Sequence, residues 1–188
     1  MKKIGSAEIE RRKQKRNQLI LGIILALVMF FSVIGYASQG ATTNTKLIKY
    51  KGFEFIKQNN YWVLEKAGVD FYLSSKPDEL QDINTTLKPI SNYVDEPLYI
   101  YSNDPEINTQ IYLNFKKIAT RIQPACLENQ TCKGDFPIKN CTKNFIIIQE
   151  SNETSIKQKQ NCVYIKGEKQ NLLKLIDIFL LKTLGIKQ

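Results

Sequence analysis

The sequence contains no histidine and only one tryptophan. Histidine is the side chain that most often transfers protons near neutral pH, and it is the commonest metal ligand. Also missing are the phosphate-binding Walker loop, the dinucleotide-binding fingerprint and the G-x-S-x-G motif of hydrolases. The acidic residues after residue 39 are scattered, with no pair on an obvious shared face. We therefore expect a protein that is not an enzyme and has no cofactor or metal.

Charge is missing from one long segment near the N-terminus. Residues 19–45 contain no charged side chain, and residues 19–38 are almost wholly apolar. A helix of that length is about 30 Å long and matches the hydrocarbon core of a bilayer. Buried helices of soluble proteins are rarely apolar on every face over this length. We predict a transmembrane helix at residues 19–38. A cleaved signal peptide is the alternative, but its apolar core is normally shorter.

The residues on either side of this segment predict its orientation. Residues 1–18 hold seven basic side chains against two acidic ones, whereas the polar linker of residues 39–46 starts without any charge. Basic residues next to a span stay in the cytoplasm. We predict a single-pass protein of the cell membrane with a cytoplasmic tail (residues 1–18) and an external domain (residues 47–188). The tail supplies five of the nine net positive charges, so the basic composition does not indicate nucleic-acid binding.

The four cysteines are Cys126, Cys132, Cys141 and Cys162. Outside the cell, an even number of cysteines usually forms disulfides. Structural zinc sites bring cysteines in closer pairs, and redox sites use C-x-x-C, so metal-binding and redox-active thiols are the weaker alternatives. Four cysteines allow three pairings. We favour Cys126–Cys132 and Cys141–Cys162, because the latter two each precede an apolar strand.

Four Asn-x-Ser/Thr sequences also follow the apolar segment. Such sequences accept N-linked glycans on external loops. The predicted glycosylation sites are Asn84, Asn129, Asn140 and Asn152.

An aromatic-rich block at residues 50–75 starts the external domain. Alternating apolar residues separated by turn residues predict two or three antiparallel strands. Trp62 could belong to a platform on which a sugar stacks, although aromatic residues of a small sheet more often form its core.

The next segment predicts a strand followed by a helix. Residues 98–101 form the strand, Asp104 is a suitable N-cap and Pro105 suits the first helical position. One apolar stripe continues toward Pro124; it comprises Ile107, Ile111, Phe115, Ile118 and Ile122. Ligands of open α/β sheets bind where strands lead into helices. Ser102, Asn103 and Asp104 are therefore candidate ligand-binding residues, with helix capping the simpler role for Asp104.

The C-terminal segments predict two buried strands and a helix. Residues 144–150 and 162–167 are apolar runs typical of neighbouring strands, joined by a turn with a possible edge strand. The final helix should end at Gly185, with Ile186 folding back onto it. Lys174 and Asp177 are spaced for a surface ion pair. The expected fold class is α+β: one transmembrane helix and one disulfide-bonded domain with an antiparallel or mixed sheet and two packed helices.

Three C-terminal motifs also carry a family resemblance. They are PIKNCTKNFIIIQE, NCVYIKG and DIFLLKTLGI at residues 137–150, 161–167 and 177–186. In these motifs the chain resembles single-span envelope proteins of unknown role from small-genome archaea. The resemblance implies an external domain and identifies no active residues.

These patterns predict a non-catalytic binding or scaffolding protein of the cell envelope. Its expected partners are membrane lipid around the span and another envelope protein or a second copy of the chain, with no nucleic acid. One alternative is a thiol–disulfide protein in which Cys126 and Cys132 cycle. The other is a sugar-binding module that uses Trp62.

Overall fold

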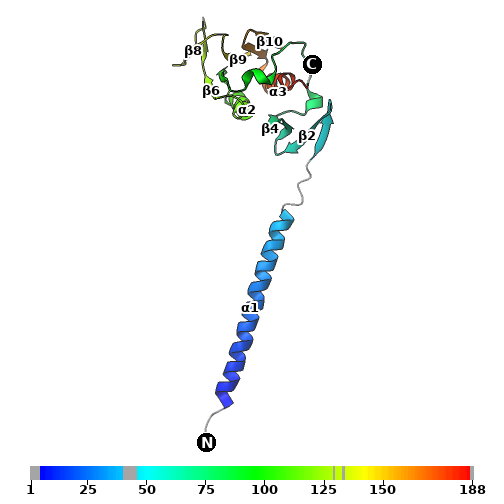
Figure 1. The fold of residues 1–188 in the computed structure, drawn as a ribbon, viewed down its shortest axis with the longest axis vertical. Coiled ribbons are helices and arrows are strands. Elements are labelled where there is room, and N and C mark those ends of the chain that lie inside the picture. Colours follow the sequence, from blue (N-terminus) through cyan, green and yellow to red (C-terminus); the bar gives the residue numbers. More distant parts are fainter. Residues whose placement is uncertain (1–4, 40–45, 129, 133, 187–188) are drawn as a thin grey trace. The chain divides into compact units, whose positions relative to one another are not determined.

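The computed structural model describes residues 5–39, 46–128, 130–132 and 134–186. The chain divides into two compact units, residues 1–44 and 45–188. In the described residues, the first unit contains one long helix, and the second contains a four-stranded, a five-stranded and a two-stranded sheet, two further α-helices and two disulfides (Figure 1). The predicted α+β class is confirmed.

Helix α1 (Gly5–Gln39) is longer than the predicted span. It begins within the basic tail, so the tail from Gly5 onward and the apolar segment form one continuous helix. Its part from Arg11 to Ser32 is long and apolar enough to cross a membrane, and none of that part is buried in the protein. At 1.5 Å per residue this part is about 33 Å long, slightly more than the hydrocarbon core of a bilayer. Most of the predicted linker lies outside the described residues.

Four antiparallel strands form the first sheet of the second unit. They follow one another in space as in sequence: β1 (Leu47–Tyr50), β2 (Phe53–Gln58), β3 (Tyr61–Lys66) and β4 (Val69–Leu73). The sequence predicted two or three strands, and the turn at Lys51 and Gly52 adds β1 to them. Both turn residues have positive φ, 46° and 84°. Two-residue hairpin turns of this kind match the twist of the strands that they join, so β1 pairs with β2.

The second sheet has five strands in the order β10-β11-β9-β5-β6. Neighbours are parallel except for the antiparallel pair of β10 and β11. The strands are β5 (Pro97–Tyr101), β6 (Arg121–Pro124), β9 (Asn144–Glu150), β10 (Ser155–Lys159) and β11 (Cys162–Gly167). The predicted neighbours at 144–150 and 162–167 are confirmed, and the connection between them supplies the edge strand β10.

Helix α2 (Pro105–Phe115) starts as predicted but ends earlier. The amides of Ile118 and Ala119 both donate to the Phe115 carbonyl, which tightens the last turn, and Thr120 then pairs with Glu96 beside β5. The chain is extended from there into β6. The prediction of a helix reaching Ile122 is therefore wrong. Ile118 continues the buried surface beyond the helix, which is why the apolar stripe runs on.

Helix α3 (Leu172–Thr183) ends as the sequence predicted. Gly185 has a φ of 71°, a left-handed conformation that glycine adopts without strain. The Gly185 amide donates to the Lys182 carbonyl, and the Ile186 amide donates to the Leu181 carbonyl. Ile186 is buried. This is the glycine-ended cap with its hydrophobic contact. Short 3₁₀ turns, η1 (Pro77–Glu79), η2 (Ile90–Tyr93) and η3 (Lys169–Asn171), occur in the connections.

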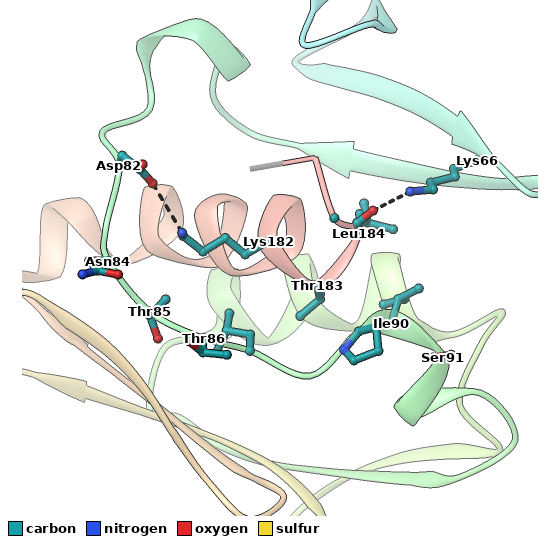
Figure 2. Close-up of a pocket in the computed structure, with 13 residues that line it drawn as sticks. Lys66, Asp82, Asn84, Thr85, Thr86, Ile90, Ser91, Lys182, Thr183 and Leu184 are labelled. Carbon is teal, nitrogen blue, oxygen red and sulfur yellow. Dashed lines mark hydrogen bonds and ion pairs between the residues drawn. The ribbon is translucent and has the colours of Figure 1, made fainter. Parts of the chain in front are cut away.

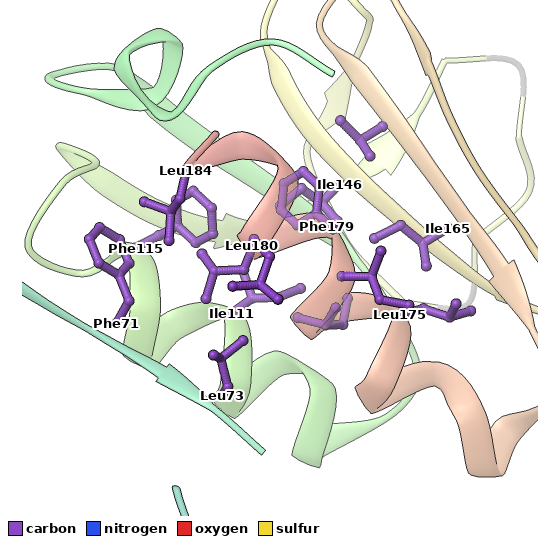
Figure 3. Packing of buried hydrophobic residues seen from close by; sticks show 14 of the residues in the cluster. Phe71, Leu73, Ile111, Phe115, Ile146, Ile165, Leu175, Phe179, Leu180 and Leu184 are labelled. Atoms are coloured by element: carbon purple, nitrogen blue, oxygen red, sulfur yellow. The ribbon is translucent and has the colours of Figure 1, made fainter. Parts of the chain in front are cut away.

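The main core lies where the two sheets and the two helices meet. Figure 3 shows Phe71 and Leu73 of β4 on one side of the helices, and Ile146 and Ile165 of the five-stranded sheet on the other. Phe179 of α3 lies among these groups and is fully buried. Burial of this apolar surface is the main contribution to the stability of the fold.

The opposite face of the five-stranded sheet has a smaller core. The described residues of 125–141 cover it, with the short parallel strands β7 (Cys126–Leu127) and β8 (Ile138–Lys139). Tyr99, Phe145 and Ile147 point to this side, whereas their neighbours in sequence point to the main core. This alternation follows from the two-residue period of strands, and it makes β5 and β9 apolar on both faces.

Candidate functional sites

The four cysteines form the two disulfides favoured in the sequence. Cys126 pairs with Cys132, with Cα atoms 5.9 Å apart, and Cys141 pairs with Cys162, with Cα atoms 5.0 Å apart. The second bond joins the amino ends of the parallel strands β9 and β11, as its prediction required. Elsewhere in the described part of the chain, no group of three or more metal-ligating side chains comes together.

A cleft of about 570 Å³ lies at the carboxyl ends of the parallel strands. The chain leaves β5 through α2 toward β6, and it leaves β9 through β10 toward β11 on the other side. The order of connections therefore reverses between β5 and β9. Ligands of open α/β sheets bind at such a switch point. We call this pocket the switch-point cleft. It is lined by Tyr101, Ser102, Asn103, Asp104, Ile148, Gln149, Glu150, Ser151, Lys166 and Leu172.

The candidate residues of 102–104 all lie in this cleft, but two of them have local partners. An Asp104 carboxylate oxygen accepts hydrogen bonds from the amides of Glu106 (2.9 Å) and Ile107 (3.4 Å). The Ser102 hydroxyl oxygen accepts one from the Asp104 amide at 3.1 Å. Asp104 is therefore the helix cap of α2, the simpler of its two predicted roles. Asn103 is exposed and its side chain has no hydrogen bond within the described residues.

The other side of the switch-point cleft was not predicted. Gln149 and Glu150 end β9, and Lys166 lies near the end of β11. Their side chains make no hydrogen bond or ion pair with the residues that the structure describes. The cleft thus presents an amide, a carboxylate and an ammonium group to a ligand. Residues 144–150 and 162–167 were predicted as neighbouring strands, but only their parallel pairing in the structure brings these two ends together.

Trp62 lies away from this cleft and is a core residue. Only 5% of its surface is exposed. The Lys57 ammonium lies 5.2 Å from the centre of its ring, a cation–π contact. The structure thus supports the core interpretation, since so small an exposed area leaves little of the ring for a sugar to stack on.

Three of the four predicted glycosylation sites are exposed asparagines. They are Asn84, Asn140 and Asn152. Asn129 lies outside the described residues. The Asn140 side-chain oxygen accepts from the hydroxyl of Thr142, two residues on, at 2.7 Å. These positions are open to solvent, as glycan acceptors must be.

A larger pocket of about 710 Å³ lies between α3 and the segment of residues 82–91, which we call the strap (Figure 2). Lys182 of α3 and Lys66 at the end of β3 line it together with polar residues of the strap. The Lys182 ammonium lies 3.4 Å from an Asp82 carboxylate oxygen. The Lys66 ammonium donates to the Leu184 carbonyl at the end of α3. No local sequence pattern predicts this strap pocket, because its parts come from three distant segments.

Asp177 is fully buried in α3, so its predicted surface pair with Lys174 is wrong. One of its oxygens accepts from the Ser74 amide and the Gln110 side chain, both at 3.1 Å. The other accepts from the Ser74 hydroxyl (2.7 Å) and the Ser75 amide (2.8 Å). Burial raises the pKa of Asp177 to about 6, despite the opposite effect of the bonds from Ser74 and Ser75. These hydrogen bonds connect α3 to α2 and to the segment after β4.

The helix, the sheets and the disulfides together define a class of protein. It is an α+β domain with two disulfides that follows a helix able to cross a membrane. Comparisons of the chain with protein-family models, curated proteins and solved structures find no match. Function must therefore be inferred from the sites themselves.

Proposed function

We propose that the chain is a non-catalytic, membrane-anchored protein whose second unit binds a ligand outside the cell. The basic residues before the apolar segment support a cytoplasmic N-terminus. The two disulfides support an oxidising environment for residues 46–186. The exposed asparagines of the three described sequons are consistent with the same side of the membrane.

The observation that carries the binding role is the switch-point cleft. It lies where the architecture of parallel strands places ligand sites, and its volume falls in the range of small-molecule pockets. Asn103, Gln149 and Lys166 offer hydrogen-bond donors, and Glu150 offers acceptors. Asp104 is engaged in capping α2, so its carboxylate serves structure rather than proton transfer. A small polar ligand is the occupant that fits these groups.

The orientation is tested by protease treatment of intact cells that produce the full chain with a C-terminal reporter. We expect the protease to remove the reporter and to release a fragment with both disulfides. A reporter that stays protected until the cells are lysed would place the second unit in the cytoplasm and contradict the proposal.

Ligand binding is tested with the full chain in lipid nanodiscs, selectively labelled for NMR at asparagine, glutamine and lysine. The probes are amino acids, nucleosides and neutral monosaccharides at millimolar concentration. We expect one of these classes to shift the signals of Asn103 and Gln149, and the variant Asn103→Ala to weaken that response. The matched control is Asn60→Ala, on an exposed turn of the first sheet. The binding role is contradicted if no class shifts the cleft signals while the spectrum shows a folded protein.

A further inference from the structure

The strap pocket contains an ammonium group that is nearly buried. The Lys182 side chain is only 5% exposed, whereas its partner Asp82 is 59% exposed. Within the described residues, the Asp82 carboxylate at 3.4 Å is the only partner of this ammonium, although an ammonium has three N–H donors. A buried charge is costly unless it is well paired. The Lys182 ammonium therefore has N–H donors that no described residue accepts, and the pocket is where a ligand can reach them.

A second ammonium group, that of Lys66, lines the same pocket. It donates one hydrogen bond to the Leu184 carbonyl and lies 5.0 Å from the centre of the Phe53 ring. These contacts fix it at the end of α3, where a positive charge is favourable. Two of its donors remain. The charged residues that line the pocket are thus two lysines and one aspartate, with a net positive charge.

The strap supplies neutral polar groups opposite the lysines. Figure 2 shows Asn84, Thr85 and Thr86 on the strap, which runs alongside the α3 segment that carries Lys182. The hydroxyls of Thr85, Thr86 and Ser91 and the amide of Asn84 make no side-chain hydrogen bond to any described residue. Leu87, Pro89 and Leu184 add apolar surface. Unpaired hydroxyl and amide groups beside an apolar wall are typical of sites for hydroxylated organic molecules.

We propose that the strap pocket binds a small hydroxylated anion, a sugar-like molecule with a carboxylate or phosphate group. The acid group of the ligand bonds to the Lys182 and Lys66 ammonium groups, and its hydroxyls bond to Thr85, Thr86 and Ser91. Without a ligand, the Asp82 carboxylate forms the ion pair with the Lys182 ammonium. Because Asp82 is exposed, its side chain can turn into solvent when the ligand takes its place. This site is separate from the switch-point cleft and shares no residue with it.

A purely structural role for both lysines makes a different prediction. In that case they only neutralise the C-terminal end of α3 and Asp82, and added anions would not compete. The two roles are separated by removing each charge in turn. If the pocket binds anions, loss of Lys182 and loss of Asp82 must change the affinity in opposite directions.

The test is isothermal titration of the full chain in nanodiscs of neutral lipid, made in a host without N-glycosylation so that Asn84 carries no glycan. The probes are glucuronate, glucose 6-phosphate and, as the neutral match, glucose. We expect at least one anion to bind about tenfold or more tightly than glucose, because an added ionic contact near a buried partner contributes that much. The better of the two anions tells whether the site prefers carboxylate or phosphate.

Three variants complete the test. Lys182→Met keeps the aliphatic stem and should weaken anion binding about tenfold or more. Asp82→Asn removes the competing carboxylate and should strengthen it about threefold, as expected for an exposed ion pair. The control Lys49→Met removes an exposed lysine that pairs with Glu54 at 2.9 Å, and it should leave binding unchanged.

The proposal is overturned if neither anion binds, if glucose binds as tightly as both anions, or if Lys182→Met binds like the parent chain. Near-UV circular dichroism shows whether Lys182→Met is folded. If it is not, Asp82→Asn decides, because Asp82 is exposed and contributes little to the fold; an unchanged or weaker affinity in that variant then refutes the site. These outcomes do not depend on the switch-point cleft, so the two proposals fail separately.

Discussion

The two faces of the five-stranded sheet are covered in different ways. One face packs against α2, α3 and, through them, the four-stranded sheet, and its core contains most of the large buried side chains. The other face is covered by the described residues of 125–141, and the core there contains six buried residues among those described. Both disulfides lie on this second side: one closes a loop within the covering segment, and the other joins it to β11.

This difference shows how the domain stabilises a segment with little regular structure. Helices bury a continuous apolar stripe, whereas a loop buries few side chains to offset the conformational entropy that each ordered residue loses. A disulfide offsets that loss by restricting the unfolded chain. We therefore expect apolar packing to hold the first face and covalent bonds to hold the second.

The largest effect should come from the core of the first face. Phe179→Ala removes a fully buried ring that lies 6.1 Å from Phe115 and 6.3 Å from Tyr93, measured between ring centres. The free energy of unfolding should fall by about 3–5 kcal/mol, measured by urea denaturation of the full chain in detergent. The control is Tyr112→Ala on the exposed side of α2. A loss below about 1 kcal/mol would mean that the first face does not depend on this packing.

The disulfides should have the next largest effect, on the second face. Replacing Cys141 and Cys162 by serine should cost about 3 kcal/mol, since the bond spans 21 residues. Replacing Cys126 and Cys132 should cost about 2 kcal/mol, because the loop that this disulfide closes is shorter. In the second variant, hydrogen exchange should accelerate mainly in residues 125–141, whereas α3 keeps its protection. Equal acceleration in α3 would show that the two faces are not independently stabilised.

At neutral pH the buried carboxylate of the first face should give a smaller effect, which changes with pH. Asp177→Asn keeps the shape but turns one acceptor into a donor facing other donors, which should cost about 2 kcal/mol at neutral pH. The folded state raises the pKa of Asp177 from 3.8 to about 6, so folding favours the protonated acid. This group therefore favours folding most below pH 3.8, and the contribution is lost as the pH rises through about 6.

Urea denaturation across this pH range measures the effect. The unfolding free energy of the parent chain minus that of Asp177→Asn should decrease as the pH rises from 4 to 6. A difference that is constant over this window would mean that Asp177 keeps its ordinary pKa in the folded protein.

The smallest effect is expected for an apolar residue on the outside of the second face. Ile138 of β8 is 70% exposed. Ile138→Ser should change the unfolding free energy by no more than about 0.5 kcal/mol. A larger loss of stability in the full chain would show that Ile138 contributes to an apolar contact, and the second face would then be less dependent on its disulfides than we infer.

Local patterns predicted much of the secondary structure. The cap of α2 at Asp104, the end of α3 at Gly185 and the buried strand at residues 144–150 depend on neighbouring residues or on a simple period, so they are visible in the sequence. The pairing of Cys141 with Cys162 followed from placing both before apolar strands. The end of α2 could not be found in this way, because Thr120 pairs with Glu96 across the fold.

The candidate sites show the same difference between local signals and contacts of distant residues. Ser102, Asn103 and Asp104 were candidates because a strand leading into a helix is a local signal. Asp177 looked like a surface residue because its partner Ser74 is 103 positions away. Lys66 and Leu184, which meet at the strap pocket, are separated by 118 positions. The sequence by itself determined the apolar helix and most elements and favoured the cysteine pairs that form, since these follow from short-range periodicity and spacing. Only the tertiary structure decided which charges are buried and which side chains form a pocket, because burial depends on residues that are distant along the chain.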